Sequence, residues 1–164
     1  MRRIIGVDPG IALAGYGIIQ GDAHRMQVVA SGVLVTHKEL SLPQRLLALY
    51  EGLSEIISEY NPTEIAVEEL FFRRNVTTAF ALGQARGVFL LAAEQQGLSY
   101  FEYTPPQVKQ GVSGYGKADK KQMQQMVKLL LGLSTIPKPD DVADALAVAI
   151  CHMQFSGWHQ AISK

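Results

Sequence analysis

The sequence predicts an α/β fold in which a mixed five-stranded sheet is flanked by helices. Three short apolar runs lie in the first 36 residues, and beyond residue 40 stretches of helical periodicity alternate with two more strand-like runs. The length of 164 residues leads us to expect a single domain over residues 1–164. A content of 48% hydrophobic and 18% charged residues excludes an intrinsically disordered chain.

The first three strands are predicted to form an antiparallel meander. Residues 3–7 (RIIGV) are a β-branched apolar run that ends at Asp8-Pro9-Gly10, as a buried strand ends at a turn. Residues 15–20 and 28–36 are further apolar runs, separated by a polar stretch. Strands joined by such short connections are expected to pair with their neighbours in sequence.

A helix is predicted after the meander. Between residues 46 and 60, apolar residues recur at three- and four-residue spacing. Ser41 and Gln44 supply a capping-box pattern at the start of this helix, and Asn61-Pro62 ends it.

Two more strands enclose a second helix. Residues 63–69 (TEIAVEE) and 99–103 (SYFEY) are the predicted strands. Asn75 is placed to cap the intervening helix, which extends to about Gln96. Gly97 ends it, because glycine readily adopts the left-handed conformation that closes many helices.

The last third of the chain is predicted to be mostly helical. Pro105-Pro106 opens a short helix, a glycine-rich loop follows over residues 111–116, and basic amphipathic and apolar helices span residues 117–131 and 140–155. The loop and Lys117 match the start of a phosphate-binding P-loop, but Ala118 replaces the required hydroxyl residue. We therefore expect a flexible loop that substrate orders, and no nucleotide site.

Charge is balanced overall but segregated along the chain. Lysine plus arginine and aspartate plus glutamate each total 15. Residues 37–70 carry two basic residues and seven glutamates, whereas residues 105–130 carry five lysines and one aspartate. Such a chain can hold a metal and a polyanion together, so nucleic acid stays among the expected partners.

The sequence favours the cytoplasm. Its one cysteine, Cys151, cannot form an intrachain disulfide and is expected to be a small apolar helix residue. The N-terminal apolar run is too short for a signal peptide. No stretch approaches the ~18 apolar residues that would span a bilayer, so no membrane contact is expected.

Acidic residues stand at three separate points of the predicted fold. Asp8 ends the first strand, Glu68 and Glu69 end the fourth, and the final helix opens with Asp140, Asp141 and Asp144. Some of these acids have simpler explanations than a shared site. Asp140 is explained by capping of the helix, Asp8 could serve only in the turn, and Glu69 could simply be exposed to solvent. Asp141 and Asp144 are three residues apart and share a helix face.

These acids could form a single site if the first and fourth strands are neighbours. Asp8 and Glu68 would then converge where the final helix begins. Four carboxylates in one place repel strongly unless cations neutralise them. Oxygen ligands without His or Cys suit Mg²⁺ or Mn²⁺, and two such ions could clamp a phosphodiester and activate water.

The segments GVDPG, GYGII, AVEELF, LGQARG, QVKQ and PDDVADALAVAI resemble, in this order and spacing, the RuvC family of Holliday junction resolvases from about residue 4 to 155. The resemblance implies a ribonuclease-H-like fold and a homodimer that cuts two opposing strands of a four-way DNA junction during recombination and repair. Carried over by position, the catalytic and metal-binding acids are Asp8, Glu68, Asp141 and Asp144. Glu69 then lies outside the site, and Asp140 is a cap.

The expected contacts with DNA follow from two segments. A basic arm near the glycine loop could be solvated helix surface, but beside a metal site it is expected to bind phosphates: Lys109, Lys117, Lys120 and Lys121. The resemblance gives Lys109 and Lys120 a place near the scissile phosphate. Phe71, Arg73 and Arg74 leave the fourth strand, where an inserted ring can unstack a base step. The resemblance favours Phe71 over Phe72 as that ring.

The second predicted helix carries a stripe of small residues, namely Ala79, Gly83 and Gly87. Glycine costs about 1 kcal/mol in a helix interior, so the stripe indicates close packing. Internal packing is one explanation, but the homodimer that the resemblance implies favours the other, in which this stripe forms the dimer interface. A twofold dimer would place identical sites on two opposing strands. The resemblance also implies cooperation with a branch-migration motor.

Other functions fit parts of this pattern. One is a nuclease of the same fold that processes ribosomal RNA precursors, and another is a junction-binding module without catalysis, which the four acids oppose. A sugar-kinase-like ATPase opens with a similar aspartate turn but needs a second domain of comparable size. We expect a Mg²⁺-dependent endodeoxyribonuclease with two ions per site, Mn²⁺ as a substitute, and products with 5′-phosphate and 3′-hydroxyl ends.

Overall fold

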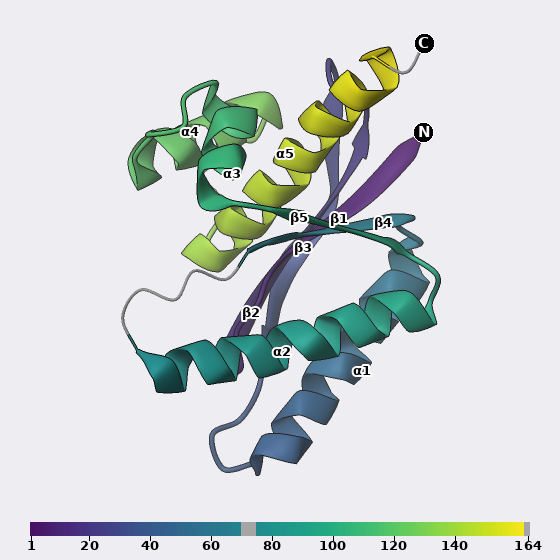
Figure 1. The fold of residues 1–164 in the computed structure, drawn as a ribbon, viewed down its shortest axis with the longest axis vertical. Coiled ribbons are helices and arrows are strands. Elements are labelled where there is room, and N and C mark those ends of the chain that lie inside the picture. Colours follow the sequence, from purple (N-terminus) through teal and green to yellow (C-terminus); the bar gives the residue numbers. More distant parts are fainter. Residues whose placement is uncertain (70–74, 163–164) are drawn as a thin grey trace.

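In a computed structural model, which describes residues 1–69 and 75–162, a five-stranded sheet lies between two layers of helices (Figure 1). The strand order is β3-β2-β1-β4-β5. The strands are β1 (Arg2–Asp8), β2 (Leu13–Gly21), β3 (Met26–Val35), β4 (Glu64–Glu68) and β5 (Ser99–Tyr103). The first three are antiparallel, whereas β4 is parallel to both β1 and β5. The predicted mixed sheet and meander are confirmed, and the first and fourth strands are neighbours, which meets the condition for the acids on them to converge.

Each face of the sheet has its own hydrophobic core. Helices α1 (Leu42–Tyr60) and α2 (Val76–Gln95) cover one face, and the other carries α3 (Pro105–Ser113), α4 (Lys120–Leu130) and α5 (Asp140–Ile162) (Figure 1). Alternate residues of β1 serve the two cores: Ile4 packs with α5, and Ile5 packs with α1 and α2. The apolar run of α5 from Val142 to Met153 is almost wholly buried, so this helix is held firmly against the sheet.

Side-chain caps set the helix boundaries as the sequence predicts. Ser41 and Gln44 form the reciprocal capping box of α1, and Asn75 accepts a hydrogen bond from the backbone N–H of Thr77 at the start of α2. Gly97 follows α2 with a φ of +74°. Local chemistry therefore decides where these two helices begin and end.

Three predicted boundaries in the last third are wrong. Helix α3 continues through residues 111–113, and Gly114 ends it in the left-handed conformation, so the glycine-rich loop is shorter than expected. Helix α4 begins at Lys120 instead of residue 117, because Asp119 caps it and forms a capping box with Gln122. Helix α5 extends seven residues beyond the predicted end, to Ile162.

Helix α2 is long and apolar enough to cross a membrane by length and composition alone, with a mean hydropathy of 1.3. Polar residues such as Gln84 and Arg86 interrupt its apolar residues, so no continuous run marks it in the sequence. Its inner face, which includes Ala85 and Phe89, is fully buried in the core beside α1.

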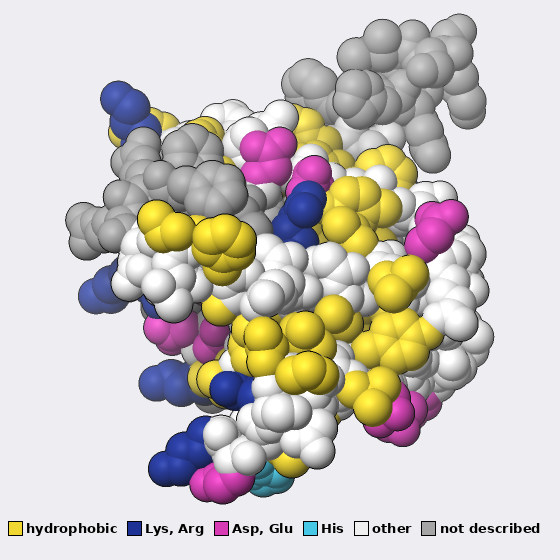
Figure 2. All heavy atoms as spheres, turned by 60° about the horizontal axis from the view of Figure 1, so that its bottom comes forward, with side chains coloured by type: hydrophobic (Ala, Val, Ile, Leu, Met, Phe, Trp, Pro, Cys, Tyr) yellow, Lys and Arg dark blue, Asp and Glu magenta, His cyan; other side chains and the backbone are white. Residues whose placement is uncertain are grey.

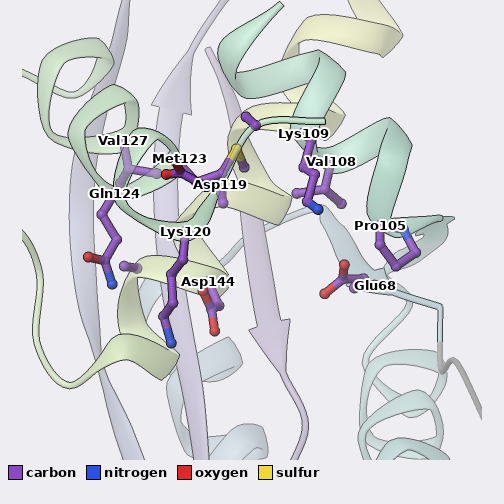
Figure 3. Close-up of a pocket in the computed structure, with 13 residues that line it drawn as sticks. Glu68, Pro105, Val108, Lys109, Asp119, Lys120, Met123, Gln124, Val127 and Asp144 are labelled. Carbon is purple, nitrogen blue, oxygen red and sulfur yellow. The ribbon is translucent and has the colours of Figure 1, made fainter. Parts of the chain in front are cut away.

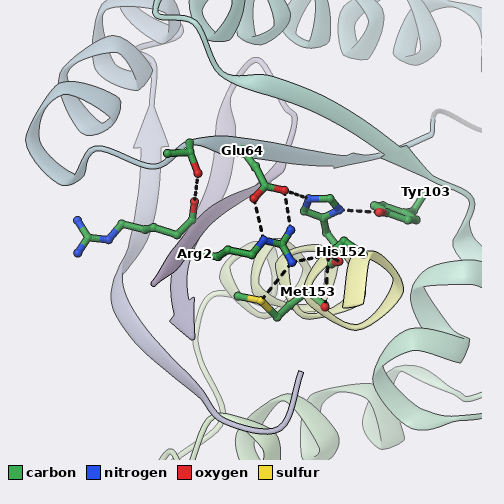
Figure 4. A network of polar contacts seen from close by, with 8 residues as sticks. Arg2, Glu64, Tyr103, His152 and Met153 are labelled. Atoms are coloured by element: carbon green, nitrogen blue, oxygen red, sulfur yellow. Dashed lines mark hydrogen bonds and ion pairs between the residues drawn. The ribbon is translucent and has the colours of Figure 1, made fainter. Parts of the chain in front are cut away.

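A polar network fastens α5 to the sheet away from the first turn of the helix (Figure 4). Arg2 donates two hydrogen bonds to the Glu64 carboxylate, at 2.9 and 2.6 Å. The fully buried His152 ring lies between the same carboxylate and the Tyr103 hydroxyl, with both contacts at 2.6 Å. The ring of Phe101 stacks on His152 at a centroid distance of 4.1 Å. The network joins β1, β4, β5 and α5.

We predict that His152 makes stability depend on pH below neutrality. Burial lowers the pKa of His152 below 6.5, although Glu64 opposes this shift. The unfolded chain therefore takes up a proton more readily than the folded protein, and acidification from about pH 7.5 to about pH 5.5 favours unfolding. Urea unfolding across this range should show a smaller loss of stability for His152→Gln than for the wild type. Equal losses would contradict a buried neutral ring.

Candidate active site

The parallel pairing of β1 and β4 brings two acids to the same edge of the sheet. Val7 and Val67 are partners in the register, so Asp8 and Glu68, which follow them, are neighbours at the carboxyl ends of their strands. Val7 and Val67 belong to the core on the α1 and α2 side. Because side chains alternate along a strand, Asp8 and Glu68 point toward α5.

The first turns of α5 add two more acids at this edge. Asp141 and Asp144 lie on the face of the helix that meets the strand ends, and the Asp8 carboxyl is within hydrogen-bonding reach of Asp141. Asp8 and Glu68 are half-buried, whereas Asp144 is exposed. Four acids that are up to 136 residues apart in sequence therefore face one another.

Burial and the charges of neighbouring carboxylates raise the pKa of three of these acids. Burial, followed by the charges of Asp144 and Asp141, raises the pKa of Asp8 from 3.8 to about 8. Desolvation and Asp144 also raise the pKa of Glu68, and Lys109 opposes this change. Desolvation also raises the pKa of Asp144, and the charge of Lys120 opposes this increase. The protein's own cations thus compensate the negative charge only in part.

A cleft of about 230 Å³ is lined by two of these acids, Glu68 and Asp144, but not by Asp8 or Asp141. Figure 3 shows the Glu68 and Asp144 side chains on opposite sides of it, with Lys109 above Glu68 and Lys120 alongside Asp144. Apolar side chains such as Val108 and Val127 complete its wall. The cleft therefore combines lysines that could bind a phosphate with carboxylates that could bind a metal ion beside it.

Asp140 has a different role from the predicted helix cap. Its carboxylate accepts a hydrogen bond from Gln124 at 3.1 Å and pairs with the Lys120 ammonium at 2.6 Å. The hydrogen bond from Lys120 holds the pKa of Asp140 below its usual value. Asp140 therefore connects α4 to the start of α5. Both partners are more than half exposed, so a phosphate could compete for Lys120 at little cost.

The donor set fits a hard divalent cation. All four acids offer carboxylate oxygens, the ligands that Mg²⁺ and Mn²⁺ prefer. Within residues 1–69 and 75–162, no three His, Cys, Asp or Glu side chains already stand close enough to hold an ion. Carboxylates without a cation between them repel one another, so a ligand shell would form only as the cation binds.

The remaining predicted DNA contacts divide into two groups. Lys117 and Lys121 are exposed near the cleft but do not line it. Phe71, Arg73 and Arg74 lie outside the residues that the structure describes. The position of this second group relative to the cleft stays a prediction.

The small-residue stripe of α2 faces outward. A Cβ atom added at Gly83 or Gly87 would meet nothing within 4 Å, so internal packing is the wrong explanation for these glycines. Val76 and Phe80 on the same helix are 72% and 68% exposed. Figure 2, which turns the α1 and α2 side forward, shows hydrophobic side chains gathered across this face.

Sequence reasoning missed the histidine network and the link between Asp140 and Lys120. The indication of the network was His152 itself, a polar residue within an otherwise apolar helix run. The contact of Lys120 with Asp140 had no comparable indication, because it joins two helices whose relative position follows from the fold.

Comparison with known proteins gives consistent matches along almost the whole chain. The profile of the family described as crossover junction endodeoxyribonuclease RuvC matches residues 4–152. The proteins of that name from Alkaliphilus oremlandii and Desulfitobacterium hafniense (strain DCB-2) are 57% and 58% identical over 149 residues. These alignments cover 91% of this chain and 91% and 90% of the two relatives.

Solved structures agree with the sequence matches. The structure of T. thermophilus RuvC in complex with a Holliday junction substrate has a TM-score of 0.93 at 32% identity, with 97% of each chain covered. The yeast mitochondrial Holliday junction resolvase Ydc2 has a TM-score of 0.70 at 17% identity, covering 98% of this chain and 81% of its own. The second likeness shows a common fold.

We predict that Asp8→Asn stabilises the protein when divalent cations are absent. Because the folded-state pKa of about 8 exceeds 3.8, the folded protein loses stability as pH rises between these values. Asparagine carries no charge and avoids this loss. In EDTA at about pH 8, the free energy of unfolding measured in urea should be at least about 1.4 kcal/mol higher for the variant than for the wild type, the equivalent of one pKa unit.

Glu69→Gln is the matched control, because Glu69 is an exposed acid one residue beyond β4. It should leave stability unchanged under the same conditions. An Asp8→Asn protein that is no more stable than this control would show that repulsion at the edge of the sheet is weak.

Proposed function

The chain belongs to the RuvC family of crossover junction endodeoxyribonucleases, and we propose that it resolves four-way (Holliday) DNA junctions by cutting two opposing strands. The observation that carries this proposal is the convergence of four acids, of which Glu68 and Asp144 line a cleft together with Lys109 and Lys120. Membership of the family supports a metal-dependent nuclease acting in recombination and repair.

The four acids are proposed to bind Mg²⁺, two ions per site, with Mn²⁺ as a substitute. Such ions supply an activated water and stabilise the leaving oxygen. The carboxylates would fix the ions at the sheet edge, and the cleft would hold the phosphate. Attack of water on phosphorus would break the bond to the 3′ oxygen; water loses a proton and the 3′ oxygen gains one, so the products carry a 5′-phosphate and a 3′-hydroxyl group.

The lysines of α3 and α4 are proposed to hold the DNA backbone. Lys109 and Lys120 line the cleft on opposite sides, which suits contact with the scissile phosphate. Lys117 and Lys121, exposed nearby, are proposed to bind flanking phosphates, and Phe71, Arg73 and Arg74 to open and clamp the junction.

A second copy of the chain is the proposed partner of α2. The outward face of this helix combines large exposed apolar side chains with Ala79, Gly83 and Gly87, which allow another helix to approach closely. A twofold dimer would present two cutting sites to two strands related by symmetry. We further propose that residues 1–164 act as one nuclease domain in the cytoplasm, together with a branch-migration motor.

We predict that Asp8→Asn abolishes cleavage while junction binding persists. The substitution removes one carboxylate ligand but leaves the lysines in place. With a synthetic immobile four-way junction and Mg²⁺, the cleavage rate should fall by roughly 10³-fold or more, and the dissociation constant for the junction should change little. Gel assays of cutting and of binding measure the two effects.

Glu69→Gln is again the control and should cut normally. Cutting by Asp8→Asn at the wild-type rate would remove Asp8 from the proposed site. Wild-type protein that cuts folded RNA and leaves the junction intact would favour the ribosomal RNA nuclease instead.

We predict that Phe80→Glu disrupts the dimer. A charge placed on the apolar face of α2 would be desolvated in the interface, so sedimentation should show a monomer at concentrations where the wild type is a dimer. Leu129→Glu is the matched control, because Leu129 is 72% exposed on α4 and should leave the mass unchanged. A dimeric Phe80→Glu protein would locate the interface elsewhere.

A further inference from the structure

Helix α5 approaches the sheet over a trough of three glycines on β1 and β2. Gly6 and Gly17 are partners in the antiparallel register, and Gly15 is the partner of Asp8. All three have negative or extended backbone angles, since the glycines with positive φ lie elsewhere. The trough therefore needs glycine for the space that a side chain would occupy, and not for an unusual backbone conformation.

At Gly6 and Gly15 an added Cβ atom would first meet the backbone of α5, whereas at Gly17 it would first meet a side chain. At Gly6 the nearest atom is the carbonyl oxygen of Ala145, at 2.0 Å. A Cβ atom at Gly15 would lie 2.1 Å from the carbonyl oxygen of Asp141 and 2.4 Å from its carbonyl carbon. At Gly17 the nearest atoms belong instead to the side chain of Leu146, at 2.5 and 2.6 Å. A side chain can rotate away, whereas a helix carbonyl can retreat only with its residue.

We propose that Gly15 is a positioning residue for the metal centre, because its missing side chain lets the backbone of Asp141 rest against the strand that pairs with Asp8. The inference rests on the proposed function of the four acids. Restoring an ordinary contact at Gly15 would move Asp141 by about 1 Å, whereas metal–ligand distances tolerate only about 0.2 Å. A methyl group at this position would therefore displace the backbone of Asp141, and with it the carboxylate that is proposed to share the ion with Asp8.

The test compares Gly15→Ala with Gly17→Ala in the absence of DNA. Binding of Mn²⁺ to purified full-length protein is followed by electron paramagnetic resonance, and thermal unfolding is measured alongside. Gly15→Ala should weaken Mn²⁺ binding by about 10- to 100-fold, the range seen when ligand positioning is disturbed. Gly17→Ala should lower the unfolding temperature but keep Mn²⁺ affinity within about 2-fold of the wild type.

A second variant separates position from stability. Asp141→Glu lengthens the side chain by one methylene and should weaken Mn²⁺ binding in the wild-type background. Combined with Gly15→Ala, the longer side chain should recover part of the lost affinity, because it spans the added distance. A purely structural role for Gly15 predicts no recovery.

The outcomes distinguish this inference from the function on which it rests. Wild-type affinity in Gly15→Ala, or equal loss in Gly15→Ala and Gly17→Ala without rescue, would overturn the role of Gly15 and leave the metal centre standing. Equal Mn²⁺ binding by the wild type and Asp8→Asn would overturn both. If Gly15→Ala fails to fold while Gly17→Ala folds, Gly15 serves folding and the proposal is wrong.

Discussion

Repulsion among carboxylates at one edge of the sheet is the constraint on which the rest of the structure depends. Asp8, Glu68, Asp141 and Asp144 come from three elements, and burial together with their mutual charge raises the pKa of Asp8 to about 8. The arrangement persists because α5, which carries two of the acids, buries almost its whole apolar run against the sheet. Hydrophobic burial thus offsets an electrostatic cost that a bound cation would relieve.

Two acids on the same face of the sheet have pKa values that are shifted in opposite directions. Glu64 and Glu68 are four residues apart on β4, and both point toward α5. Burial acts against the charge of each, but hydrogen bonds from Arg2 and His152 lower the pKa of Glu64, whereas Asp144 helps to raise that of Glu68. One end of α5 is therefore fastened by paired charges, and the other keeps negative charge that is open to a ligand.

Most of the fold follows from local sequence. The spacing of apolar residues identifies the strands. Capping identifies the ends of α1, because Ser41, Gln44 and Asn61 act on backbone groups within one turn. The boundaries that went wrong also have local causes: Gly114 and Asp119 each offered a cap that competed with a longer loop or helix. The stripe of small residues on α2 left internal packing and a dimer interface both open, because sequence pattern alone does not say which side of a helix the chain leaves uncovered.

The sequence by itself determined the order of elements, the mixed sheet and the acids that a metal centre would use. Only the tertiary structure decided that Asp140 pairs with Lys120, that His152 bridges Glu64 and Tyr103, and that Asp141 rests against Gly15. The physical reason is the separation in sequence over which each kind of interaction acts. Hydrogen-bonded caps and side-chain periodicity act between near neighbours in sequence, whereas the distance between a helix and a strand depends on every atom packed between them.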